Sequence, residues 1–155
     1  MNKTMKNLTT YLIILLSVFA LSSCSTDKTM VAKGVDLKKY EYASIVKGQT
    51  LHGTETDIEI EPGIYDAIES TRLKMVGDRH VSDLSDNQKE KLVLVKYAAT
   101  SSTERSVLSV SFEDYMTGKT VVSCRASNRT AWTRQKDVDK AIRKLSGRIM
   151  SVWGR

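Results

Sequence analysis

The chain has 155 residues, with 24 Lys and Arg against 18 Asp and Glu, a formal net charge of +6 and two cysteines. This length allows one ordinary domain of about 130 residues behind a short leader. The basic excess is mild and no Lys/Arg cluster alternates with aromatic residues, so we do not expect a nucleic-acid-binding domain.

The first 23 residues have the pattern of an export signal. Two lysines precede an apolar run at residues 11–21, which is shorter than the ~20 apolar residues that a membrane-spanning helix needs. Directly behind this run, Leu21-Ser22-Ser23-Cys24 resembles the lipobox of bacterial lipoproteins. The resemblance implies removal of residues 1–23 and acylation of Cys24, so that acyl chains hold the protein on a lipid bilayer. A conventional signal that happens to precede a cysteine, or an uncleaved anchor, stays as an alternative.

Cleavage would also change the charge and the cysteine content. Removing Lys3 and Lys6 leaves 22 basic against 18 acidic residues, a net charge of +4. Acylation of Cys24 would leave Cys124 as a single thiol, so no internal disulfide is expected and stability must come from the apolar core. Cys124 falls in phase with apolar neighbours, which favours a buried small side chain over a nucleophile.

Residues 24–34 are predicted to be the lipidated cysteine and a flexible spacer, because residues 25–34 are mostly polar, lack periodicity and end on glycine. Residues 35–155 are predicted to form a single domain.

The first half of this domain predicts a strand and a helix. Residues 39–46 place apolar side chains on two alternating faces, which predicts a strand. Residues 58–60 are expected to be extended, and Pro62 to stand in the first turn of a helix. Apolar residues at helical spacing carry that helix to Gly77. Residues 80–88 are expected to form a short strand or turn and then a polar break.

The second half predicts three strands and a long helix. Residues 92–95 are apolar on both faces, which is typical of a central strand covered on both sides. Residues 107–115 and 120–127 alternate and predict a hairpin. Residues 137–153 have apolar positions at helical spacing and acidic residues at the start. Gly147 inside this helix costs ~1 kcal/mol relative to alanine, so we expect it to lie against a neighbouring element.

This order of elements predicts an α+β fold, with an antiparallel-rich sheet of about four to five strands and two helices packed on one face. Residues 36–40, the hairpin at 109–119 and the helix at 137–153 together resemble small lipoproteins of Bacteroides-type bacteria that consist of one α+β domain of unknown function. The resemblance implies a lipid-anchored protein of the bacterial cell envelope, with the outer membrane as the expected location, and it supplies no catalytic residue.

Motifs for catalysis, metal binding or nucleotide binding are not found in the sequence. The two histidines, His52 and His80, stand in predicted loops, no His, Cys or acidic residues cluster at ligand spacing, and no glycine-rich phosphate motif occurs. We therefore expect no enzyme, no cofactor and no metal site. An enzyme acting on cell wall or glycans stays as an alternative, which would require a carboxylate pair of Asp114 with Glu113 or Glu69.

The candidate binding surface is a basic stripe on the last helix. Lys136, Lys140 and Arg143 lie opposite the apolar stripe and are flanked by Lys144. Such a stripe is either an ordinary solvated face or a contact for an acidic partner, namely lipid headgroups or an envelope polymer. The sequence thus predicts a membrane-tethered binding or accessory domain with an unidentified envelope partner. An accessory subunit of a transport or secretion complex is the alternative.

Overall fold

The computed structural model describes residues 27–46, 55–101, 105–129 and 134–154. The predicted lipidation residue Cys24 and the loop residue His52 lie outside the described residues. Within the described ranges, no helix has the length and apolar character needed to cross a bilayer.

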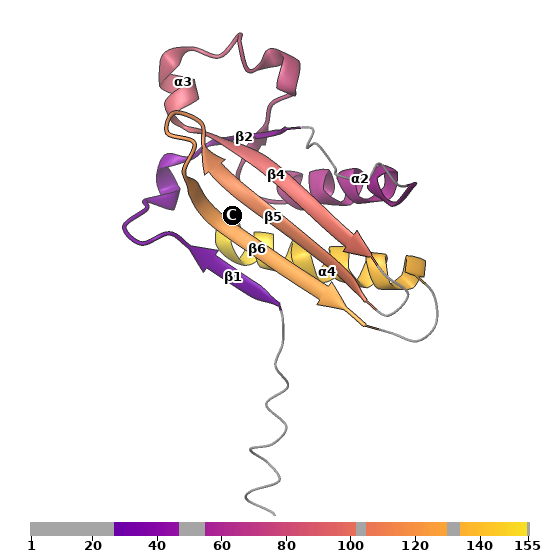
Figure 1. The fold of residues 1–155 in the computed structure, drawn as a ribbon. Coiled ribbons are helices and arrows are strands. Elements are labelled where there is room, and N and C mark those ends of the chain that lie inside the picture. The colour runs from indigo at the N-terminus through magenta and orange to yellow at the C-terminus, as the bar shows by residue number, and fades with distance from the viewer. Residues whose placement is uncertain (1–26, 47–54, 102–104, 130–133, 155) are drawn as a thin grey trace, which may run out of the picture.

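Six strands form one mixed sheet, in the spatial order β1-β6-β5-β4-β2-β3 (Figure 1). The strands are β1 (Lys28–Val31), β2 (Tyr42–Ile45), β3 (Lys74–Met75), β4 (Leu92–Ser101), β5 (Ser106–Asp114) and β6 (Thr120–Asn128). Strands β1, β6, β5 and β4 pair antiparallel in turn, whereas β2 runs parallel to both β4 and β3. The predicted α+β class is confirmed, but the sheet has more strands than expected and its β2–β3 edge is parallel.

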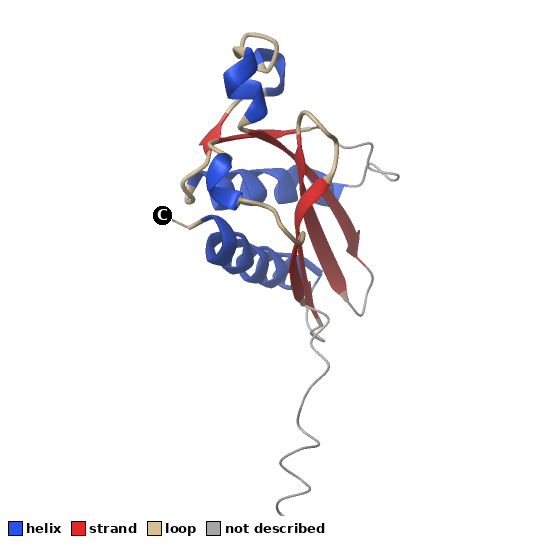
Figure 2. Cartoon of the chain, turned by 90° about the vertical axis from the view of Figure 1, so that its left-hand side faces the viewer, coloured by secondary structure: helices blue, strands red, loops and turns tan. Residues whose placement is uncertain are grey.

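Two long helices, α2 (Glu55–Glu69) and α4 (Arg134–Trp153), lie on one side of this sheet (Figure 2). Helix α4 packs on β5 and β6, and α2 packs beside α4. Shorter helical segments connect the strands: η1 (Leu37–Lys39), η2 (Asp78–His80) and α3 (Asp86–Glu90). The two predicted helices therefore cover the same face, as expected.

The core lies between α4 and the sheet. Trp153 is fully buried, with its ring centroid 5.2 Å from that of Phe112 and 6.1 Å from that of Tyr40. The predicted helical stripe is confirmed, since Val138, Ala141, Leu145, Ile149 and Trp153 are all buried. Burying such a set of large apolar side chains is the main source of the stability of the domain. The hairpin of β5 and β6 also agrees with the alternating sequence pattern.

Helix α2 differs most from its prediction. It begins at Glu55, so residues 58–60 are helical rather than extended, and Pro62 lies inside the helix. The helix ends at Glu69 instead of Gly77. Thr71 explains this end, because its hydroxyl donates to the Ile68 carbonyl at 2.6 Å and accepts from the Leu73 amide at 3.1 Å. The chain then enters β3, where pairing with β2 replaces further helical hydrogen bonds.

The prediction of a flexible spacer at residues 25–34 is wrong from Lys28 onward. Lys28–Val31 form β1, which pairs antiparallel with Val122–Arg125 of β6. The pairing continues at Ala32, whose amide donates to the Val121 carbonyl at 2.9 Å. The folded domain therefore includes β1 and reaches at least to Asp27, which leaves only a few residues behind Cys24 to act as a linker.

Two further local predictions are corrected by the structure. Of the two forms predicted after His80, the structure has the turn and not the strand, and the predicted polar break is instead the start of α3, where Ser85 and Gln88 form a capping box. Gly147 has no atom within 4 Å of the position that a Cβ would take, so it does not lie against a neighbour. The close approach occurs instead at Gly63 of α2, where that position is 2.7 Å from Ile142 Cγ2.

Candidate functional site

Asp27, the first described residue, is fastened to the end of β6. Its Oδ1 accepts hydrogen bonds from the Ser127 backbone amide at 2.7 Å and from the Ser127 hydroxyl at 3.2 Å. Its Oδ2 lies 3.8 Å from Lys144 Nζ and 3.9 Å from Arg148 Nη2. Burial alone would raise the pKa of Asp27, but the hydrogen bonds and the two cations outweigh it and lower the pKa. The ionised carboxylate, three positions after Cys24, thus holds the residue before β1 at the end of β6.

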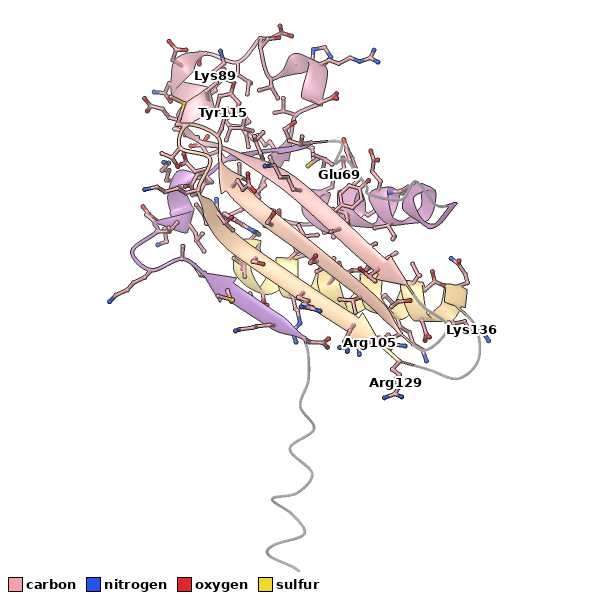
Figure 3. The ribbon with its side chains drawn as sticks, viewed as in Figure 1. Glu69, Lys89, Arg105, Tyr115, Arg129 and Lys136 are labelled. Carbon is pink, nitrogen blue, oxygen red and sulfur yellow. The ribbon has the colours of Figure 1, made fainter. Side chains whose placement is uncertain are left out.

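Basic side chains from several segments gather around this contact. Lys144 Nζ donates to the Ser127 carbonyl at 2.9 Å, and Arg105 Nη2 donates to the Ser127 hydroxyl oxygen at 3.3 Å. Figure 3 shows Arg105, Arg129 and Lys136 together at one end of the sheet. We call this region the basic end and define it by six residues: Arg105, Arg129, Lys136, Lys140, Arg143 and Lys144.

The start of α4 is held at the basic end by a buried polar contact. Asn128 Nδ2 donates to Asp137 Oδ1 at 2.8 Å, and both side chains are buried. The neighbouring Lys136 and Lys140 are exposed on the outer side of α4. The exposed carboxylate of Asp139 stands beside them and accepts a 3.4 Å bond from Gln135. Asp137 thus points inward, whereas Asp139 is exposed among the cations of this surface.

The predicted basic stripe is therefore divided into two parts. Lys136, Lys140 and Arg143 are exposed on α4, as the sequence predicts. Lys144 has a different role, because its ammonium group is bound to the Ser127 carbonyl and faces Asp27. It helps to hold β1 on the sheet and is less available to an external partner.

Asp114 forms a second polar centre at the opposite end of β5, next to the β5–β6 turn. Its carboxylate accepts hydrogen bonds from Tyr40 OH at 2.8 Å, Lys39 Nζ at 2.9 Å, and the Thr117 amide and hydroxyl at 2.8 Å and 3.0 Å. Burial by itself would raise the pKa of Asp114, but these donors hold it well below its ordinary value of 3.8. Burial, together with the Asp114 carboxylate, raises the pKa of Tyr40.

The Asp114 side chain is buried, although the residue stands at the start of the β5–β6 turn. An open hollow of about 410 Å³ lies beside it, lined by Lys39, Glu90, Lys91, Asp114, Met116 and Thr117. With four donors already on its carboxylate, Asp114 has the environment of a structural acceptor rather than of a general acid, which needs a raised pKa.

The carboxylate pair required by the glycan-enzyme alternative is not assembled. Adjacent residues of a strand point to opposite faces: Asp114 is buried, whereas Glu113 lies on the open face with an oxygen 2.6 Å from Lys96 Nζ. Glu69 is exposed at the end of α2 and does not line the hollow at Asp114. Neither proposed partner therefore reaches the Asp114 carboxylate as a second acid.

Potential metal ligands and nucleophiles have other surroundings. In the part of the chain that the structure describes, no group of three or more His, Cys, Asp or Glu side chains converges. His80 Nδ1 lies 3.0 Å from Asp83 Oδ2 on the exposed surface. Cys124 is fully buried in β6, and burial raises the pKa of its thiol. The expectation of a buried cysteine is thus confirmed.

The comparisons with known proteins concern the fold. No protein-family model matches the chain, and no curated protein matches it either. Among solved structures, a PelC dodecamer from Paraburkholderia phytofirmans is similar with a TM-score of 0.58 and 11% sequence identity, over 84% of this chain and all of that chain. A point-substituted PelC dodecamer from the same organism has a TM-score of 0.59 and 12% identity, over 83% and 99% of the two chains. At this identity, the likeness shows a shared fold over nearly the whole length of PelC.

Two of the residues that organise these regions were missed in the sequence. Asp27 stands in a polar stretch without periodicity, and its partner Ser127 lies 100 positions later. Arg72 stands in a turn, yet its guanidinium donates to the Tyr40 carbonyl at 2.6 Å and lies 5.5 Å from the centre of the Trp153 ring. The sequence around Asp27 shows only a polar composition without periodicity, and such a composition indicates a linker.

Proposed function

We propose that the protein is a lipid-anchored domain of the bacterial cell envelope that acts by binding a partner, without chemistry of its own. The observation that carries this proposal is the lipobox-like sequence that ends at Cys24, only three positions before Asp27. Two or more acyl chains anchor a protein stably, so a Cys24 that carries them would hold the folded domain directly at a membrane surface.

The arrangement of the carboxylates supports a binding role. Asp27 and Asp114 both have lowered pKa values and both accept hydrogen bonds that join distant segments of the chain. They stabilise the fold as permanent anions, whereas a general acid at neutral pH requires the opposite shift. The exposed cations of the basic end are the surface groups best suited to contact a partner.

Lipidation is tested by growing the expressing bacterium with labelled palmitate. The wild-type protein is expected to incorporate the label, and Cys24→Ala is expected to lose it. Cys124→Ala is the matched control and should retain the label, because its thiol is buried. Label that persists on Cys24→Ala would refute the anchor.

A thiol titration of the purified, unfolded protein tests the acylation of Cys24 independently. The chain contains two cysteines, and acylation of Cys24 would convert its thiol into a thioether. One reactive thiol per chain is then expected in denaturant. Two reactive thiols per chain would mean that Cys24 is unmodified.

A second candidate is an accessory subunit that works in several copies within a transport or secretion complex. It is favoured by the likeness to PelC, whose solved structures are dodecamers. A heterologous contact between identical subunits closes into a ring when its rotation permits. Native mass spectrometry of the detergent-extracted protein tests it: a single closed oligomer supports this candidate, and a monomer at all concentrations contradicts it.

A further inference from the structure

The proposed anchor leaves little chain between the membrane and the fold. Asp27 follows Cys24 by three positions, and three fully extended residues span at most about 11 Å. The Asp27 carboxylate is in turn fixed to Ser127 at the end of β6 by a 2.7 Å hydrogen bond. If acyl chains leave from Cys24, the Asp27 end of this contact lies no more than about 11 Å from the anchor, a distance comparable with the Debye length of ~8 Å at physiological salt.

The contacts around Ser127 show which residues share this end of the molecule. Arg105 and Lys144 donate hydrogen bonds to Ser127. Arg129 follows two positions later and is exposed. Asn128 binds Asp137, which places the first turns of α4, and with them Lys140, beside the tip of β6. Figure 3 shows Arg105, Arg129 and Lys136 at this same end.

The charges of the domain are unevenly distributed. Helix α2 contains several Asp and Glu residues and no Lys or Arg, whereas α4 contains six Lys and Arg and only two Asp. Of those two acids, Asp137 is buried against Asn128 and Asp139 is exposed. The outer face of α4 beside the β6 tip is thus cationic apart from Asp139, which matches a surface of anionic headgroups.

We propose that the basic end docks on the anionic lipid headgroups of the membrane that holds the anchor, so that the domain stands in one orientation with its β5–β6 turn pointing away. This inference rests on the proposed lipidation of Cys24. The docking cations are Arg129, Lys136, Lys140 and Arg143, while Lys144 holds the linker end in place. Docking of this kind is electrostatic, so it weakens as salt is added.

The experiment uses the full lipidated protein, extracted in detergent and reconstituted into vesicles of phosphatidylcholine alone or of phosphatidylcholine with phosphatidylglycerol. An amine-acetylating reagent then labels accessible lysines, and mass spectrometry reads each site. Lys136 and Lys140 should be labelled more slowly on the anionic vesicles than on the neutral ones, and high salt should remove the difference. Exposed Lys38 and Lys119, which lie near the β5–β6 turn, should be labelled equally on both vesicle types.

A pair of charge-reversal variants separates a local surface from the net charge. Arg129→Glu/Arg143→Glu changes two exposed residues of the basic end, and Lys38→Glu/Lys119→Glu changes two exposed residues near the β5–β6 turn by the same charge. Each basic residue near an anionic surface strengthens binding by about fivefold, so the first variant should weaken docking at least about twentyfold. The second variant should keep the slow labelling of Lys136 and Lys140. Circular dichroism confirms that both variants are folded.

The outcomes distinguish this inference from the proposed function. A protein that does not float with neutral vesicles lacks the anchor, which overturns both. A protein that floats with both vesicle types but labels equally on each keeps the anchor and overturns the docking. Slow labelling of Lys136 and Lys140 on neutral vesicles, seen only when a soluble acidic polymer is added, would assign the basic end to the polymer and overturn the lipid contact.

Discussion

Gly63 of α2 lies directly against Ile142 of α4: a Cβ at position 63 would stand 2.7 Å from Ile142 Cγ2 and 3.3 Å from Ile142 Cδ1. The isoleucine cannot turn away easily, because β-branched side chains have one strongly preferred χ1 rotamer in a helix. The two helices therefore pack at this distance only because residue 63 has no side chain. Gly147 on the same α4 helix is the opposite case, with open space where its Cβ would be.

The two helical glycines should respond to alanine with opposite signs. Gly63→Ala is expected to lower the free energy of unfolding by about 1 kcal/mol, because overpacking of ~1–3 kcal/mol exceeds the gain in helix propensity. Gly147→Ala should raise it by about 0.5–1 kcal/mol. Urea denaturation measures both. Stabilisation by both substitutions would show that α2 and α4 are not in close contact at Gly63.

Removing the charge of Asp114 should destabilise the fold. Asp114→Asn leaves the donors of Lys39, Tyr40 and Thr117 without their anion, and a loss of about 2–4 kcal/mol is expected. Glu113→Gln, at the preceding residue, is the matched control. Its partner is an exposed Lys96, so less than about 1 kcal/mol should be lost. Equal losses in the two variants would contradict a structural role specific to Asp114.

The same carboxylate predicts a pH dependence. The pKa of Asp114 in the folded protein is below its ordinary value of 3.8, so its contribution to stability is present above that value and is lost as the pH falls below it. The difference in unfolding free energy between wild type and Asp114→Asn should therefore be constant from about pH 7 to pH 5 and shrink in stronger acid. Denaturation at several pH values measures it. A difference that grows in acid would contradict the lowered pKa.

Asp27 should control the attachment of β1. Asp27→Asn removes the anion that binds Ser127, Lys144 and Arg148, at an expected cost of about 1–2 kcal/mol for a partly buried charge. Hydrogen exchange of the β1 amides should become faster, while the β5–β6 pairing keeps its protection. Asp139→Asn, an exposed acid on α4, is the control and should leave β1 unchanged. Unaltered exchange in β1 after Asp27→Asn would mean that backbone pairing alone holds the strand.

Cys124 should be inert in the folded protein. Its thiol is fully buried and burial raises its pKa, so little thiolate is present at neutral pH. Alkylation by iodoacetamide is expected to proceed only as the domain unfolds, and to accelerate with urea in parallel with the loss of structure. Alkylation at the rate of an exposed thiol in native buffer would contradict this burial.

The sequence predicts helices and strands correctly where their buried residues repeat at a regular short spacing. The stripe on α4 and the alternation along β5 both repeat within a few residues, and each buries the face that its pattern indicates. The α+β class follows from these elements. The stripe of Lys136, Lys140 and Arg143 was also found in this way, because exposed positions are the complement of the buried ones.

The remaining features depend on partners that are distant in the chain. Three of the four residues of β1 are exposed, so an edge strand of this kind leaves no alternating pattern. Residues 58–60 alternate between apolar and polar side chains, as a strand would. They are helical because Ile60, Ile64 and Ile68 are then buried together on one side of α2, against the core. Asp114 looks like a turn residue until Tyr40 and Lys39, more than seventy positions earlier, are brought to it.

The pairing of β1 with β6 has a consequence for how the domain is completed. Lys28 lies opposite Arg125, so β1 finds its partner only after the chain as far as β6 is available. Pairing across such a long separation slows folding. A truncated product that ends before β6 would carry the cysteine but leave β1 and the neighbouring edge of β5 unpaired, and such an edge invites aggregation. Incomplete chains would thus expose unpaired strand edges, whereas a chain that includes β6 pairs its β1 strand with it.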